Sequence, residues 1–178
     1  MGRPLRTAKI CPVPSPVGHA LGAIAIGWAV AGPAQPKRAL LRQAGVLAAL
    51  AIAPDLDLLI GRHSRETHSI GAAALAAVVA AAFRWPLASS RARIAMAAFF
   101  AWFSHPILDS LSPDTAVPLG VMILWPFSTS HWQTGLSVFM PIWRDFSDPV
   151  WLPHDTLAVL RELAILGPIV ALVWWWKR

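Results

Sequence analysis

Histidine and carboxylate side chains gather in two short stretches of this sequence. The first stretch, PDLDLLIGRHSRETHS, lies at 54–69 between two apolar runs and contains Asp55, Asp57, His63, Glu66 and His68. The second, SHPILD, holds His105 and Asp109 four residues apart, so a helix would place both side chains on one face. A neutral imidazole and a carboxylate at that spacing can bind one divalent cation, or can form a simple internal hydrogen bond.

Each of these donors also has a purely structural interpretation. Pro54 disfavours helical angles at Ala53, so the two aspartates that follow are expected in a helix stop that is no longer helical. Thr67 or Ser69 can cap the next helix, with the histidine between them as an ordinary residue of its first turn. Against this interpretation, an unpaired carboxylate beside apolar segments or lipid is costly.

The segments that must position these groups are rich in Ala and Leu. Strand-like alternation is absent, which predicts an all-α fold of four to six helices in a single domain, 1–178. The expected helical segments are 19–32, 39–53, 69–85, 93–111 and 155–176. Gly167-Pro168 is expected to kink the last segment, and the apolar stretch 116–127 to form a short helix or re-entrant turn.

Up–down topology brings the donors together. Consecutive helices joined by short loops run antiparallel, so the loop at 54–68 and the end of the fourth segment lie at one end of the bundle. His19, at the start of the first segment, falls at the same end. We therefore expect a metal site at one end of the bundle.

Composition favours a membrane protein. Hydrophobic residues make up 56% and charged residues 13% of the chain, against about 45–50% and about 25% in soluble domains. Ten Trp and no Tyr occur, and Trp suits the lipid–water boundary. A span needs roughly 20 apolar residues, and the C-terminal segment, 155–176, is long enough. The first three segments are shorter and would be short tilted spans or core helices lying partly in the membrane. A soluble bundle with an apolar core is the alternative.

The basic residues are distributed like those of cytoplasmic loops. Net charge is +6, yet Lys and Arg sit in short groups between apolar runs, so no nucleic-acid partner is expected. By the positive-inside rule the loops 33–42 and 84–93 face the cytoplasm and the metal end faces the periplasm, although the cationic N-terminus disagrees. A signal peptide cleaved after AVAG is the less favoured alternative, because Pro12, Pro14 and Pro16 interrupt it.

The donor types restrict the metal and its chemistry. Cys11 is the only cysteine, so the ligands must be imidazoles and carboxylates. Zinc is the first choice of metal, with manganese or iron as alternatives. The site would hold one or two ions. Such a site would activate water to attack a phosphoester or ester. Glu66, or a non-ligating aspartate such as Asp57, would take the proton, and Arg62 or Arg65 would hold an anionic group. Loop solvation or anchoring at the membrane edge explains the arginines equally well.

Three pieces of the chain resemble a known family. They are PDLD, HSRETHS, and SHPILDSLSPD followed by LWPFS, within a match from about His19 to Ser128. Together they resemble the LexA-binding, inner-membrane-associated family of metal-dependent hydrolases, which is similar to the zinc-dependent phospholipase C and single-strand nuclease superfamily. The resemblance implies an all-α fold in the bacterial inner membrane with catalytic zinc.

The resemblance also implies a set of ligands. They are His19, Asp55, Asp57, His68, His105 and Asp109, with His63 at the first histidine of the second motif. Ser64 departs from the family's usual arginine, so a phosphate contact would fall to Arg62 or Arg65. Neither His131 nor His154 is followed by Glu one turn later, which favours fewer than three ions.

The leading hypothesis is therefore a multi-pass membrane hydrolase acting on a small-molecule or lipid-like substrate. Two alternatives are a carrier of metal ions or protons, and a structural bundle that uses these groups for internal hydrogen bonds. A carrier requires polar groups that continue through the bundle, whereas the helix middles are almost entirely Ala, Leu and Val.

Overall fold

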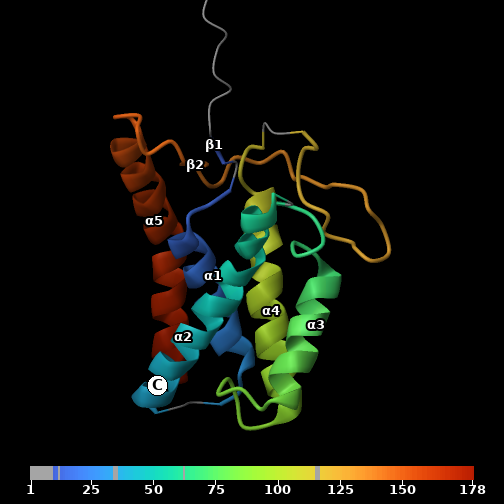
Figure 1. Ribbon diagram of the computed structural model, residues 1–178. Helices are drawn as coiled ribbons and strands as arrows, with labels where there is room; N and C mark the ends of the chain where they lie inside the picture. The colour runs from blue at the N-terminus through green and yellow to red at the C-terminus, as the bar shows by residue number, and fades with distance from the viewer. Residues whose placement is uncertain (1–9, 12, 34–35, 62, 115–116) are drawn as a thin grey trace, which may run out of the picture.

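The fold is built from five α-helices arranged up and down (Figure 1). The computed structural model describes residues 10–11, 13–33, 36–61, 63–114 and 117–178. The helices are α1 (Pro16–Val30), α2 (Lys37–Ile52), the 3-10 helix η1 (Ala53–Ile60), α3 (Ile70–Ala82), α4 (Arg91–Ser110) and α5 (Trp151–Lys177). The two-residue strands β1 (Ile10–Cys11) and β2 (Ile142–Trp143) pair antiparallel. The all-α prediction is confirmed, and each predicted helix bound lies within four residues of the observed one.

Helices α1 and α4 form the centre of the bundle. α1 packs against α2, α4 and α5, while α4 packs against α1, α2 and α3. The core between them is made largely of small side chains, including the fully buried Ala23, Ala51, Ala97 and Ala101. Small residues let helix axes approach closely, which is how apolar helices pack in a membrane. The segment considered above as a signal peptide is thus a central helix of the bundle.

Serine side chains begin three of the helices. Ser15, Ser69 and Ser90 precede α1, α3 and α4, and each hydroxyl accepts a hydrogen bond from a backbone N–H of the first turn. Of the two residues considered as the cap of α3, Ser69 is therefore the one used. The hydroxyl of Thr67 instead contacts the site described below.

The α-helix ends just before Pro54, as predicted, but the prediction that the chain there is no longer helical is wrong. Ala53 keeps right-handed helical angles (φ −57°, ψ −36°), and the chain continues as η1 until Gly61 ends it at φ +68°. Proline is tolerated here because it stands in the first turn of η1, where its missing N–H has no required partner. Asp55 and Asp57 consequently project from a rigid helical turn.

The apolar stretch at 116–127 is not helical. Among its described residues, turns occupy 123–127, and Val121 forms a β-bridge with Trp132. Pro118 and Pro126 lie in this stretch, and a proline in a helix interior removes a hydrogen bond and clashes with the preceding turn. α5, in contrast, continues through Pro168 without interruption.

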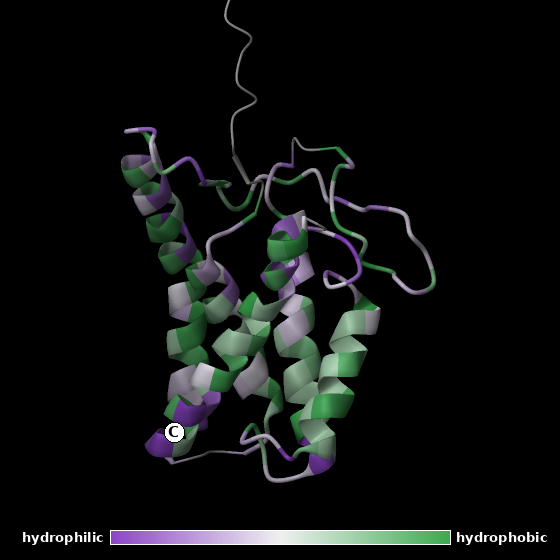
Figure 2. Cartoon of the chain, viewed as in Figure 1, coloured by the Kyte–Doolittle hydropathy of each residue, from purple (hydrophilic) through white to green (hydrophobic). Residues whose placement is uncertain are grey.

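Two helical segments are long and apolar enough to cross a membrane, namely Lys37–Ile60 and Trp151–Lys177. α1 and α3 are apolar but shorter, with 15 and 13 residues. Most residues of the helices are hydrophobic (Figure 2). Many apolar side chains are exposed on the outside of the bundle, including Leu75 and Val78 of α3, each 66% exposed. Exposed apolar surface of this extent is expected of helices that face lipid.

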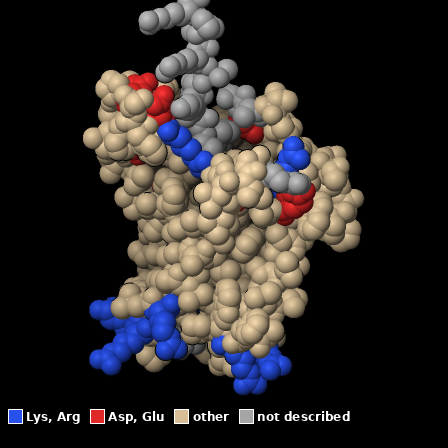
Figure 3. Space-filling view, in the orientation of Figure 1, with Lys and Arg blue, Asp and Glu red and all other residues tan. Residues whose placement is uncertain are grey.

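The carboxylates lie at one end of the bundle, together with some basic residues, whereas the opposite end carries basic residues without carboxylates (Figure 3). All nine carboxylates lie between residues 55 and 162, at the end where α1 and α3 begin and α4 finishes. Eight basic residues lie at the opposite end: Lys37, Arg38, Arg42, Arg84, Arg91, Arg93, Lys177 and Arg178. There Lys177 of α5 donates hydrogen bonds to the carbonyls of Ala29 and Gly32, at the end of α1.

Candidate metal centre

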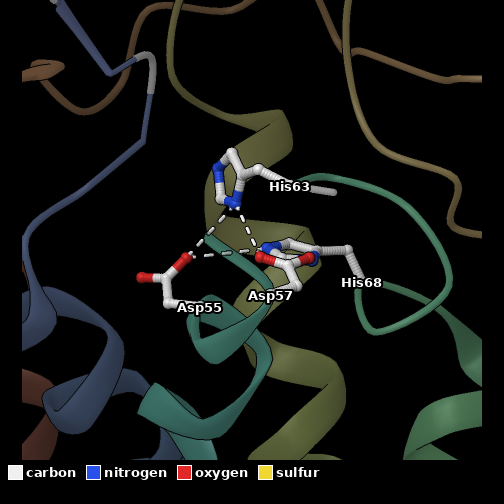
Figure 4. A group of neighbouring side chains, drawn as sticks. All are labelled: Asp55, Asp57, His63 and His68. Carbon is white, nitrogen blue, oxygen red and sulfur yellow. Dashed lines mark hydrogen bonds and ion pairs between the residues drawn. The ribbon is translucent and has the colours of Figure 1, made fainter. Parts of the chain in front are cut away.

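Four donors of the first stretch lie together at the carboxylate-rich end (Figure 4). η1 presents Asp55 and Asp57, and the loop that follows returns His63 and His68 toward them. His63 Nδ1 lies 3.2 Å from an oxygen of Asp57 and 3.6 Å from an oxygen of Asp55. His68 lies between the same carboxylates, with Nδ1 3.2 Å from Asp57 and Nε2 3.7 Å from Asp55.

The second stretch adds His105 and Asp109 from α4. Their one-turn spacing brings His105 Nε2 to 3.2 Å from Asp109 Oδ2, as the sequence predicts. His105 Nε2 also lies 3.0 Å from His68 Nε2 and 3.5 Å from Asp55 Oδ1. The two stretches therefore form one cluster.

His19 of α1 completes the cluster from a third direction. Its Nε2 lies 3.3 Å from Asp109 Oδ1, and its ring stacks on that of His105 with centroids 3.8 Å apart. His19 is fully buried because α1 is a central helix. The predicted convergence of separate chain segments on one end of the bundle is thus what the structure shows.

Backbone and hydroxyl groups orient the two central imidazoles. His105 Nδ1 lies 2.6 Å from the carbonyl oxygen of Ala51, so Nδ1–H donates to it and a neutral ring keeps its lone pair on Nε2. On the opposite side of the cluster, Thr67 Oγ1 donates to Asp57 at 2.6 Å, and Asp57 faces Nδ1 of His68. Both rings consequently direct Nε2 at the same point.

Several buried polar atoms of the cluster form no well-aligned hydrogen bond among the described residues, although some lie at ion-pair distance from one another. They are Nδ1 and Nε2 of His19, Oδ1 of Asp55, and both carboxylate oxygens of Asp109. Buried polar atoms are normally paired, and an unpaired buried carboxylate is strongly disfavoured. A cation at this point would satisfy these atoms, so the residues present fit a bound metal ion.

The spacing of the donors also fits such an ion. Four ligands held tetrahedrally at zinc-like bond lengths lie about 3.3 Å from one another. The distances that join His68 Nε2, His105 Nε2 and Asp109 Oδ2 are 3.0, 3.2 and 3.5 Å. The arrangement matches one face of that tetrahedron before any adjustment of side chains.

Two groups of donors share residues, which gives room for one ion or two. His68, His105 and Asp109 form a fully buried group, while Asp55, Asp57, His63 and His68 form a group nearer to the surface. A third group joins His19, Asp55 and His105. Asp55, His68 and His105 each belong to two groups, as expected of residues between adjacent ion positions.

The local field favours positive charge. Burial alone would lower the pKa of the His68 imidazole, but the carboxylates of Asp55 and Asp57 outweigh it and hold this pKa above its ordinary value. The same carboxylates would stabilise a divalent cation. Deprotonated His68 is the form that binds it, so proton and metal compete for this point.

Comparison with known families decides the membrane assignment. The family described as YdjM inner membrane protein matches residues 15–177, nearly the whole described chain. The chain belongs to the YdjM inner membrane protein family. No curated protein and no solved structure was found to match. Membership agrees with the two candidate spans and supports the membrane part of the resemblance noted above, while hydrolase activity and LexA binding stay predictions.

The remaining predicted residues of this YdjM-family chain lie around the cluster in the loop between η1 and α3. Glu66 is half-buried in this loop and belongs to none of the three groups of donor atoms among the described residues. Arg65 is exposed. Arg62 lies outside the described residues. Their roles in proton transfer and anion binding stay predictions.

Sequence reasoning missed Glu162 of α5. This carboxylate is fully buried and accepts hydrogen bonds from the backbone N–H of Ser15, at 2.6 Å, and from its hydroxyl. It also packs against Gly18, where a Cβ would stand only 2.7 Å from the Glu162 carboxyl carbon. Glu162 thereby fixes the first turn of α1, which includes Gly18, the residue before His19. The signal was an acidic residue inside an apolar helix, since such groups are paired or functional.

Proposed function

We propose that the protein is a membrane-bound, metal-dependent hydrolase that acts on a phosphoester or ester. The observation that carries the proposal is the convergence of buried imidazole and carboxylate atoms from α1, η1, α4 and one loop, several of which form no well-aligned hydrogen bond. A cluster built for internal hydrogen bonding alone is expected to align these groups as hydrogen-bonded pairs.

The cluster is built asymmetrically, with a closed side and an accessible side. The side chains of His19 and His105 are fully buried, whereas those of His63 and Asp55 are 17% and 12% exposed. A substrate would therefore approach from the His63 side. A divalent ion bound here would polarise the phosphoryl or carbonyl oxygen and acidify water.

Residues of the 61–69 loop would perform the remaining steps. Glu66, or Asp57 where it is not a ligand, would accept the proton from the attacking water. The exposed Arg65, with Arg62, would bind the negative charge of a phosphate group. These assignments follow from the loop's position at the accessible side of the cluster.

Charge segregation supports one orientation in the membrane. The eight basic residues at the end opposite the cluster would face the cytoplasm, because cytoplasmic loops are enriched in Lys and Arg. The cluster would then face the periplasm in a multi-pass arrangement.

A carrier of ions or protons is less well supported. Between the cluster and the basic end, the buried side chains of the described residues are apolar except for Gln43 and Lys177. Lys177 lies at the basic end itself, where it bonds the end of α1. A path for ions requires a series of polar groups through the bundle.

The test is metal content together with activity. Zinc, manganese and iron are measured by elemental analysis in purified wild type, His68→Ala and His105→Ala, with His154→Ala as the matched control. His154 is a suitable control because its Nε2 contacts the Pro141 carbonyl, away from the cluster. We expect bound metal and hydrolysis of p-nitrophenyl phosphate or p-nitrophenyl acetate to be lost in the two cluster variants and kept in the control. Metal content equal in all four proteins would overturn the metal site, and metal binding without hydrolysis would overturn the enzyme.

A further inference from the structure

An apolar groove of about 550 Å³ runs beside the cluster on the outside of the bundle. Its walls are α2, the loop between α3 and α4, and α4, through Gly45, Ala49, Ala53, Trp85, Pro86 and Trp102. No charged side chain lines it. Its volume is that of a ligand site, since such sites occupy about 300–1,000 Å³.

Gly45 lines the end of this groove that lies opposite Ala53. It lies inside α2, where glycine is less favourable than alanine by roughly 0.5–1 kcal/mol. A Cβ at Gly45 would meet no atom within 4 Å, so close helix packing does not explain the glycine. At Gly27, in contrast, a Cβ would lie 2.3 Å from Leu47. The missing side chain at Gly45 therefore leaves open space on the surface of α2.

The groove and the cluster share structural elements. Ala53, at one end of the groove, is two residues from Asp55. The indole N–H of Trp102, another wall residue, donates to the carbonyl of Thr67 at 2.8 Å, next to His68. One end of the groove therefore lies close to the cluster.

The dimensions fit one half of a bilayer. Gly45 to Ala53 are eight residues apart, which is about 12 Å along a helix. One leaflet contributes about 15 Å of hydrocarbon. The groove faces outward from a chain of a membrane-protein family, where the molecules that cover apolar surface are lipid chains.

We propose that this groove binds one acyl chain of a membrane lipid whose phosphoester or ester head group lies at the metal cluster. The inference rests on the proposed function and specifies its substrate class as a lipid. The apolar groove binds the acyl chain, and the cluster binds the head group. The length of the acyl chain, and not the head group alone, therefore determines which lipids the protein recognises.

The first experiment locates the acyl chain without relying on catalysis. Phosphatidylglycerol with a diazirine midway along one acyl chain is incorporated into vesicles with the protein, photolysed and mapped by peptide mass spectrometry. We expect labelling of residues 45–53 and Trp102, lowered about tenfold in Ala49→Leu and Gly45→Leu, which fill the groove. Ala164→Leu, an exposed alanine on α5, is the matched control and should label like wild type. Labelling spread evenly over all lipid-facing helices would overturn the groove.

The second experiment separates this inference from the proposed function. Hydrolysis of long-chain phosphatidylglycerol is compared with hydrolysis of p-nitrophenyl phosphate in wild type and the same variants. The ratio of long-chain to soluble-substrate rates should fall about tenfold in Ala49→Leu and stay constant in Ala164→Leu. A ratio that Ala49→Leu leaves unchanged would overturn the lipid-substrate inference. Groove labelling without hydrolysis of either substrate would overturn the hydrolase and leave the acyl-chain site standing.

Discussion

The Nε2 atoms of His68 and His105 face one another at a distance of 3.0 Å. The Nδ1 atoms on the far sides of both rings face acceptors, namely the Asp57 carboxylate and the Ala51 carbonyl. With both Nδ1 atoms protonated and the rings neutral, two lone pairs meet, which is unfavourable unless a proton or metal ion lies between them. Carboxylates of Asp55 and Asp109 beside this point favour the ion with the higher charge.

Removing the Thr67 hydroxyl should weaken metal binding without unfolding the protein. Thr67→Val keeps the side-chain shape but removes the hydrogen bond to Asp57, and Asp57 in turn orients His68. Loss of such an outer partner typically costs about 10–100-fold in metal affinity. Zinc titration with a competing chelator measures the change. Thr156→Val is the control, because Thr156 bonds only its own helix at the Leu152 carbonyl, and an equal loss in both variants would contradict the role of Thr67.

Chelation should destabilise the wild-type protein. A ligand present at 100 times its Kd adds about 2.7 kcal/mol to the free energy of unfolding. Removal of the metal also leaves the Asp109 oxygens buried without a well-aligned hydrogen bond. We expect the thermal unfolding temperature in detergent to fall on treatment with EDTA and to recover with zinc. In Asp109→Asn the EDTA-induced decrease should be smaller, and a decrease of the same size would argue against Asp109 as a ligand.

Breaking the contact between Glu162 and α1 should lower stability. Glu162→Ala leaves the N–H and hydroxyl of Ser15 unpaired in a buried position, which costs about 1–3 kcal/mol. Ser15→Ala removes the cap of α1 and should cost about 1 kcal/mol. Denaturant unfolding in mild detergent measures both. If the loss of unfolding free energy in the double variant equals the sum of the losses in the two single variants, the two residues do not act together.

Cysteine labelling should determine the orientation in the membrane. In a Cys11→Ser background, Ser89→Cys marks the loop between α3 and α4, and Ser130→Cys marks the long loop at the cluster end. Both positions are exposed. A membrane-impermeant maleimide added to intact cells should label Ser130→Cys and leave Ser89→Cys unlabelled until the cells are lysed. The reverse pattern would place the cluster in the cytoplasm.

The helices and their antiparallel order were predictable because both depend on local sequence. Alanine-rich runs favour helix, and Gly-Pro punctuation such as Gly32-Pro33 marks their ends. Up–down order then predicts which helix ends meet, and this is why His19, His68 and His105 could be assigned to one end before their distances were known.

The details that depend on tertiary packing could not be predicted. Pro54 fits the first turn of η1, so a residue that usually stops a helix here begins a new one. The Ala51 carbonyl that orients His105 is a backbone atom 54 positions away in the chain, and no residue type signals it. Glu162 meets Ser15 across 147 positions, which only the packing of α5 on α1 brings together.

Helix α5 contacts α1 at both ends, through Glu162 at Ser15 and through Lys177 at Ala29 and Gly32. Because α1 precedes α5 in the chain, α1 is synthesised first, and its terminal groups stay incompletely bonded until α5 follows. Both ends of α1 are therefore secured only after α5 has been made. A chain without α5 would expose the ends of α1 and become a substrate for membrane proteases rather than a partly active protein.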